Sequence, residues 1–64
     1  MLINVFTYKG HTICIRAFGG VYEYLVSGSI EGTEYSETDA IAAGKSFVDL
    51  ISSSPNKSPE SDSL

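Results

Sequence analysis

Residues 11–27 read HTICIRAFGGVYEYLVS, two runs rich in β-branched and aromatic residues on either side of Gly19-Gly20. Such residues fit the pleated surface of a β-strand. A diglycine between two such runs is a strong hairpin signal, because the tight primed turns need positive φ at both central residues. The sequence therefore predicts an antiparallel hairpin that turns at Gly19-Gly20.

The flanking residues extend this hairpin. Residues 2–8 (LINVFTY) form another strand-like run, and Lys9-Gly10 separates it from the hairpin. Together these runs predict a three-stranded antiparallel meander. Residues 28–35 (GSIEGTEY) hold two glycines among alternating polar residues, so we expect a loop there. The alternative is a short fourth strand that turns at Glu31-Gly32.

A helix is predicted to begin at Ser36, whose hydroxyl can accept a hydrogen bond from the backbone N–H of Asp39. Gly44 lies in the middle of this helix and costs about 1 kcal/mol relative to alanine, so we expect a close approach to the sheet there. The apolar residues recur at helical spacing: Ala40, Ile41, Gly44, Phe47, Val48 and Ile51. The predicted fold class is therefore α+β, a three-stranded antiparallel meander with one C-terminal helix packed on one face.

The chain is expected to form a single β-β-β-α domain over residues 1–51, followed by a tail. Residues 52–64 (SSSPNKSPESDSL) hold no apolar residue before Leu64. Such a segment cannot bury enough surface to offset the entropy lost on ordering. The sequence thus predicts a disordered, Ser/Pro-rich acidic tail.

Charge and cysteine content exclude several classes of function. Eight acids against four scattered bases give a net charge of -4, whereas nucleic-acid binders usually carry a basic stripe. One cysteine and one histidine cannot form a disulfide framework or a closed zinc site, so no metal or cofactor is expected. No segment approaches the roughly 20 apolar residues that span a bilayer. With no leader peptide and an unpaired cysteine, we expect a cytoplasmic protein without a membrane partner.

No motif predicts an enzyme or a small-molecule substrate. Residues 39–46 superficially match the end of a phosphate-binding loop, but they lie inside the predicted helix. His11 and Cys14 are expected on opposite faces of the sheet, out of reach for a catalytic dyad. A set of aromatic residues could form a stacking platform for nucleic acid, but because lysine and arginine do not flank them we expect a core role: Phe6, Tyr8, Tyr22 and Tyr24.

The turn at Gly19-Gly20 also predicts the pairing of the two central strands. A two-residue loop places Phe18 opposite Val21. Counting back in steps of two then places Arg16 opposite Glu23, an opposite-charge cross-strand pair that supports this register.

The helix is predicted to cover the tyrosine-rich face, with Ile13 and Ile15 at its centre. If Lys9-Gly10 is a second two-residue loop, Leu2 joins this face and Ile3 joins the other. A bulged loop that includes His11 would reverse the facing of every side chain in this first strand. The other face is also apolar, although the solvated side of an antiparallel sheet should be polar. Because monomers rarely expose apolar patches beyond a few hundred Å², we expect this face to bind a partner. The predicted interaction residues are Val5, Cys14, Arg16, Phe18, Val21, Glu23 and Leu25.

The sequence therefore predicts a non-enzymatic protein–protein interaction module. The expected partner is a protein, either a second copy in a homodimer or a larger protein of which this chain is a small subunit or modulator. The alternative is a small nucleic-acid-binding domain that uses the sheet face and depends on Arg16 and Lys9.

The layout also resembles known proteins. Three features carry the resemblance: Tyr8-Lys-Gly10 through Ile13, then Tyr22 to Val26, then a helix of the form S-x-x-x-A-I-x-x-x-K-x-x-V-D from Ser36 to Asp49. Over about residues 5–51, this pattern resembles short bacterial and phage proteins of strand-strand-strand-helix order. The resemblance implies that fold and no particular activity. The layout is also similar to AP2-like and integrase arm-type DNA-binding domains, which implies the nucleic-acid alternative.

Overall fold

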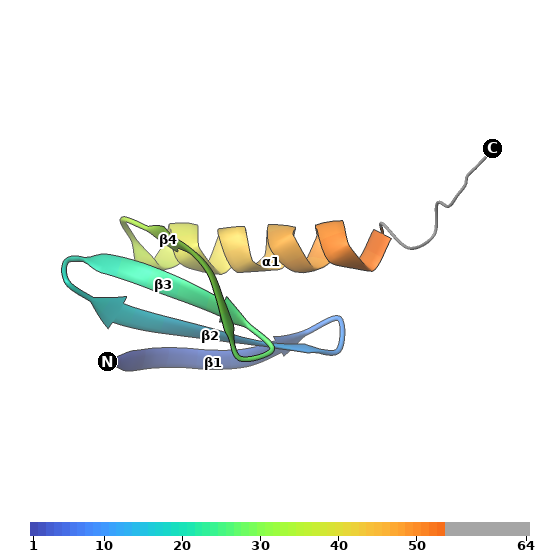
Figure 1. Cartoon of the computed structure of the whole chain (residues 1–64), viewed down its shortest axis with the longest axis horizontal. Helices are drawn as coiled ribbons and strands as arrows, with labels where there is room; N and C mark the ends of the chain where they lie inside the picture. The colour runs from blue at the N-terminus through green and yellow to red at the C-terminus, as the bar shows by residue number, and fades with distance from the viewer. Residues whose placement is uncertain (54–64) are drawn as a thin grey trace.

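The computed structural model describes residues 1–53, which form four strands followed by one helix (Figure 1). The helix includes residues 52 and 53, which the sequence assigned to the tail, and the rest of that predicted tail lies outside the described residues. The strands form one antiparallel sheet in the order β1-β2-β3-β4. The elements are β1 (Leu2–Tyr8), β2 (His11–Phe18), β3 (Val21–Val26), β4 (Ser29–Glu34) and α1 (Glu37–Ser53).

The α+β class, the antiparallel sheet and the C-terminal helix are confirmed, but the prediction of three strands is wrong because residues 29–34 form β4. The missed feature is a third tight turn at Ser27-Gly28, where φ is 52° and 87°. Positive φ at both central residues also occurs at Lys9-Gly10 and Gly19-Gly20, so both predicted turns are confirmed. The alternative of a short fourth strand is therefore confirmed, but the chain reverses at Ser27-Gly28 and not at the expected Glu31-Gly32.

Gly32, which favoured a loop in the sequence, is part of the sheet. It pairs with Tyr24 on β3, and a Cβ atom placed on Gly32 would lie only 2.7 Å from Cζ of that tyrosine. The aromatic ring therefore covers the glycine backbone and supplies the packing that glycine lacks within a strand. This cross-strand contact stabilises β4, although the composition of β4 alone does not favour a strand.

The helix begins as predicted. The Ser36 hydroxyl accepts a hydrogen bond from the backbone N–H of Asp39 at 3.1 Å, and the Ser36 carbonyl accepts one from Ala40 at 3.0 Å. These bonds satisfy backbone donors of the first turn that have no partner inside the helix. The acidic residues of this turn, Glu37 and Asp39, also interact favourably with the helix dipole.

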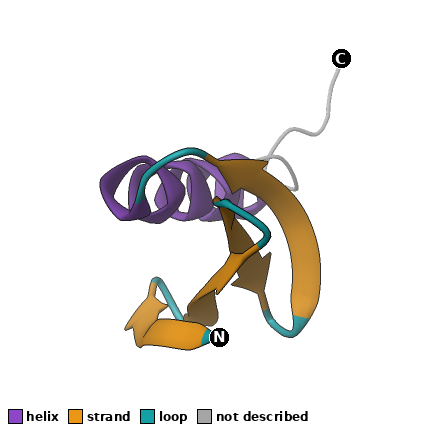
Figure 2. Ribbon diagram, turned by 90° about the vertical axis from the view of Figure 1, so that its left-hand side faces the viewer, coloured by secondary structure: helices purple, strands orange, loops and turns teal. Residues whose placement is uncertain are grey.

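The core lies between α1 and one face of a strongly curved sheet (Figure 2). Ile13 and Ile15 are fully buried there, which confirms that the helix covers the tyrosine-rich face. A Cβ atom on Gly44 would come within 3.0 Å of Ile13 Cγ2, so the predicted close approach of helix and sheet is confirmed as well. The remaining buried core residues are Val26, Ala40 and Val48.

A β-bulge at the start of β1 reverses the predicted facing of two residues. Leu2 pairs with Arg16 and Asn4 pairs with Ile15, which leaves Ile3 as the extra residue. Ile3 packs against the core, and Leu2 lies on the face that Arg16 occupies. One inserted residue shifts the alternation of side chains by one position, so counting in steps of two fails beyond it.

Candidate interaction surface

The sheet surface turned away from α1, which we call the open face, carries three rows of cross-strand neighbours. The apolar row runs Val5–Cys14–Leu25–Ile30, the charged row runs Leu2–Arg16–Glu23–Thr33, and the tip pair is Phe18–Val21. Pairing in an antiparallel sheet puts the members of each row on the same side. The open face thus brings together all seven residues that the sequence predicted as an interaction surface. In the described part of the chain, no element covers it (Figure 2).

Large apolar side chains on the open face are strongly exposed. The exposed fraction is 69% for Phe18, 55% for Leu2, 53% for Ile30 and 51% for Val5. Leu2 and Ile30 were not among the predicted residues, because Leu2 lies before the bulge at Ile3 and Ile30 belongs to β4, where a loop was expected. The signal for Ile30 was present in Ser27-Gly28, a dipeptide typical of turns. The apolar surface therefore spans all four strands.

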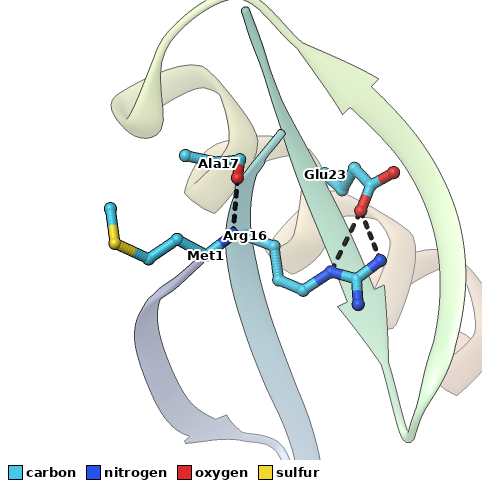
Figure 3. Close-up of polar contacts among 4 residues, drawn as sticks. All are labelled: Met1, Arg16, Ala17 and Glu23. Atoms are coloured by element: carbon cyan, nitrogen blue, oxygen red, sulfur yellow. Dashed lines mark hydrogen bonds and ion pairs between the residues drawn. The ribbon is translucent and has the colours of Figure 1, made fainter. Parts of the chain in front are cut away.

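An ion pair lies in the middle of the charged row (Figure 3). Arg16 on β2 donates two hydrogen bonds to Glu23 Oε1 on β3, from Nε at 3.0 Å and from Nη2 at 2.6 Å. The two residues are direct cross-strand partners, so the predicted register is confirmed. Because the two charges cancel, the pair makes the open face more polar but contributes no net charge to it.

The first residue of the chain fixes β1 beside the charged row. The Met1 ammonium group donates to the carbonyl oxygen of Ala17 at 2.7 Å (Figure 3). The Ala17 amide in turn donates to the Met1 carbonyl at 2.7 Å. These two bonds continue the β1–β2 pairing beyond the bulge and thereby hold Leu2 at the border of the open face.

A second polar cluster joins β1 to the helix on the other side of the sheet. The ammonium group of Lys45 lies 5.8 Å from the ring centroid of Phe6 and 5.6 Å from that of Tyr8, within range for cation–π contacts. Asp49 accepts hydrogen bonds from Lys9 at 2.7 Å and from the Tyr8 hydroxyl at 3.0 Å. Lysine thus accompanies two of the aromatic residues, contrary to expectation, but the predicted core role is confirmed, because all four aromatic residues pack against the core. Lys45 is far from Phe6 and Tyr8 in sequence but adjacent to them in space.

This cluster shifts three pKa values. The hydrogen bond from Lys9, followed by that from Tyr8, lowers the pKa of the Asp49 carboxyl group. The hydrogen bond to Asp49 is also the main cause of the raised pKa of Lys9 and of Tyr8. The cluster is thus most stable with Asp49 ionised and with Lys9 and Tyr8 protonated.

We expect the Asp49→Asn variant to lose less stability in acid than the wild type. Because the pKa of Asp49 is lower in the folded state, its contribution is complete above the unfolded value of about 3.9 and disappears as the pH falls through the folded pKa. Urea midpoints between neutral pH and about pH 2 measure this difference, which should be small for an exposed cluster. Lys9→Gln should have a similar effect, and identical acid profiles for wild type and both variants would contradict the prediction.

The other sequence motifs do not form a reaction site. His11 pairs with Tyr8 and lies near the Ser27 hydroxyl, with 3.4 Å between Nδ1 and Oγ, whereas Cys14 lies on the open face. Residues 39–46 lie inside α1, where the backbone is helical. Within residues 1–53, no group of three or more His, Cys, Asp or Glu side chains is arranged to hold a metal ion.

The comparisons with known proteins give no guide to function. No family model matches the chain, and searches of curated proteins and of solved structures found no significant match. No helix in the described residues is long and apolar enough to cross a membrane. The cytoplasmic location stays a prediction from the sequence.

Proposed function

We propose that this chain is a non-enzymatic protein-binding module and that the open face is its binding surface. The observation that carries this proposal is the exposure of Leu2, Val5, Phe18 and Ile30 on a face that none of the described elements covers. Burying apolar surface contributes about 25 cal/mol per Å², and apolar patches of a few hundred Å² on a protein surface are often binding sites. Contact with another protein would remove this surface from water.

The charged row favours a protein partner over a nucleic acid. Arg16 already donates from Nε and Nη2 to Glu23, so its positive charge is paired within the chain. The Glu23 carboxylate beside it would repel the nucleic-acid backbone, as would the net charge of -4 on the whole chain. A neutral, hydrogen-bonded pair within an apolar surface is instead compatible with a protein interface.

Site-specific photo-crosslinking in the native host tests the proposal. A benzophenone amino acid in place of Phe18 should give one or a few discrete protein adducts. The same amino acid in place of Ser46, an exposed position on α1, is the matched control and should not give them. Adding Leu25→Lys should remove the adducts formed from position 18. Equal adducts from both positions, or no protein adduct from position 18, would contradict the proposal.

A further inference from the structure

On the basis of the proposed function, we infer that the partner is a second copy of this chain. The whole chain carries a net charge of -4, so two copies repel each other over most approaches. The open face differs, because the two charged residues that the strand pairings place on it, Arg16 and Glu23, form an ion pair and cancel. Glu31 is the unpaired residue of the irregularity in β4, at the edge of the sheet. Two copies can therefore meet most easily through this face.

The order of residues within each row indicates how the two copies would be oriented. When two identical sheets pack face to face as a symmetric dimer, the two-fold axis lies in the plane between them. We call an axis that runs parallel to the strands, midway between β2 and β3, the parallel axis. It places each row of one copy against the same row of the other copy, with the residues in reverse order. Arg16 then lies opposite the partner's Glu23, and Glu23 lies opposite the partner's Arg16. An axis that crosses the strands at the charged row, the crossed axis, would instead place Arg16 opposite the partner's Arg16. It would also place Glu23 opposite the partner's Glu23.

Desolvation of the ion pair selects between these two orientations. Burying charges is costly unless each has opposite partners, and like charges that face each other in an interface repel. The parallel axis creates a square of four alternating charges, whereas the crossed axis brings like charges together. We therefore assign the axis parallel to the strands.

The apolar row and the tip pair are compatible with the same axis. Reversing the apolar row places Cys14 opposite the partner's Leu25 and Val5 opposite the partner's Ile30. Phe18 likewise lies opposite the partner's Val21. Every apolar member of these rows thus meets another apolar side chain, and the two helices end on the outer sides of a sheet sandwich.

The size of the face predicts a weak dimer. Four strands of about six residues cover roughly 400 Å² per copy, given the usual strand spacing and rise. This footprint is about half of the ~800 Å² per partner in a standard stable interface. We therefore expect a dissociation constant that is roughly micromolar or weaker.

Charge reversal tests self-association through this face. Arg16→Glu alone and Glu23→Arg alone should each raise the dimer dissociation constant by at least about tenfold, measured by sedimentation velocity with circular dichroism to verify folding. An equimolar mixture of the two variants should form a heterodimer with an affinity within about threefold of the wild type. The double variant R16E/E23R keeps the pair within each chain and should dimerise like the wild type. A mixture that associates no better than its components would overturn the inference.

The native Cys14 thiol tests the orientation. With the parallel axis, the Cα atom of Cys14 lies about 11 Å from the Cα atom of the partner's Cys14, whereas with the crossed axis these two atoms are about 17 Å apart. A short bismaleimide should therefore crosslink the wild-type dimer, and failure to do so in a proven dimer would overturn the assigned axis. If the wild type stays monomeric while position 18 gives adducts with a different protein, this inference fails and the proposed function stands. If position 18 gives no adducts at all, both fail.

Discussion

The Ile13→Ala variant is expected to lose half or more of the folding stability of the chain. Ile13 is fully buried, and its side chain is the nearest neighbour of Gly44 on the helix. Removing a buried isoleucine side chain costs about 2–5 kcal/mol, whereas fifty-three residues have a total stability of only about 3–8 kcal/mol. Urea denaturation followed by circular dichroism measures the loss.

Two controls identify the cause of this loss. Ile13→Val keeps most of the volume and should cost about 0.5–1.5 kcal/mol. Cys14→Ala changes the next residue, which faces the open side, and should alter stability by less than about 1 kcal/mol. If Ile13→Ala were as stable as Cys14→Ala, the assignment of the core to the helix side would be wrong.

The Leu25→Lys variant is expected to lose self-association and to stay folded. Leu25 is half-buried in the apolar row, between Cys14 and Ile30. A lysine there can extend its ammonium group into water in the monomer, so the cost in stability should be roughly 1 kcal/mol or less. In a dimer the same charge would be buried in apolar surroundings without an opposite charge. Sedimentation measures association, and thermal melting measures the fold.

The neighbouring residue provides the matched control. Val26 is only 3% exposed and points into the core, so Val26→Lys should unfold the chain instead of merely dissociating it. The two variants introduce the same side chain one position apart, on opposite faces of β3. Unfolding by Leu25→Lys with no change in the oligomeric state of the remaining folded protein would show that the open face is core.

The central hairpin could be predicted from the sequence because two local signals agree there. Gly19-Gly20 fits a tight turn, and the register it implies brings Arg16 opposite Glu23, as the structure confirms. The start of the helix could also be predicted from local sequence, because Ser36 and the acidic residues after it act within the first helical turn. Six of the seven predicted residues of the open face followed from this register, and Val5 followed from the turn at Lys9-Gly10.

The features that could not be predicted depend on contacts between distant residues. Ser27 adopts a positive φ that non-glycine residues rarely take, and Gly32 in β4 is compensated by the ring of Tyr24 on the neighbouring strand. The bulge at Ile3 interrupts the alternation on which the facing of β1 was counted. The position of Lys45 beside the β1 aromatic residues depends on how the helix crosses the sheet. Apart from the turn-forming dipeptide Ser27-Gly28, none of these features leaves a pattern in the local sequence.

The claim that the open face binds a second copy is tested most directly by sedimentation equilibrium of the unmodified chain across the micromolar range. We expect the average mass to rise with concentration from that of one chain to that of two, and no further, because a symmetric pair uses up both open faces. A mass that stays at one chain throughout, up to several hundred micromolar, would contradict the claim.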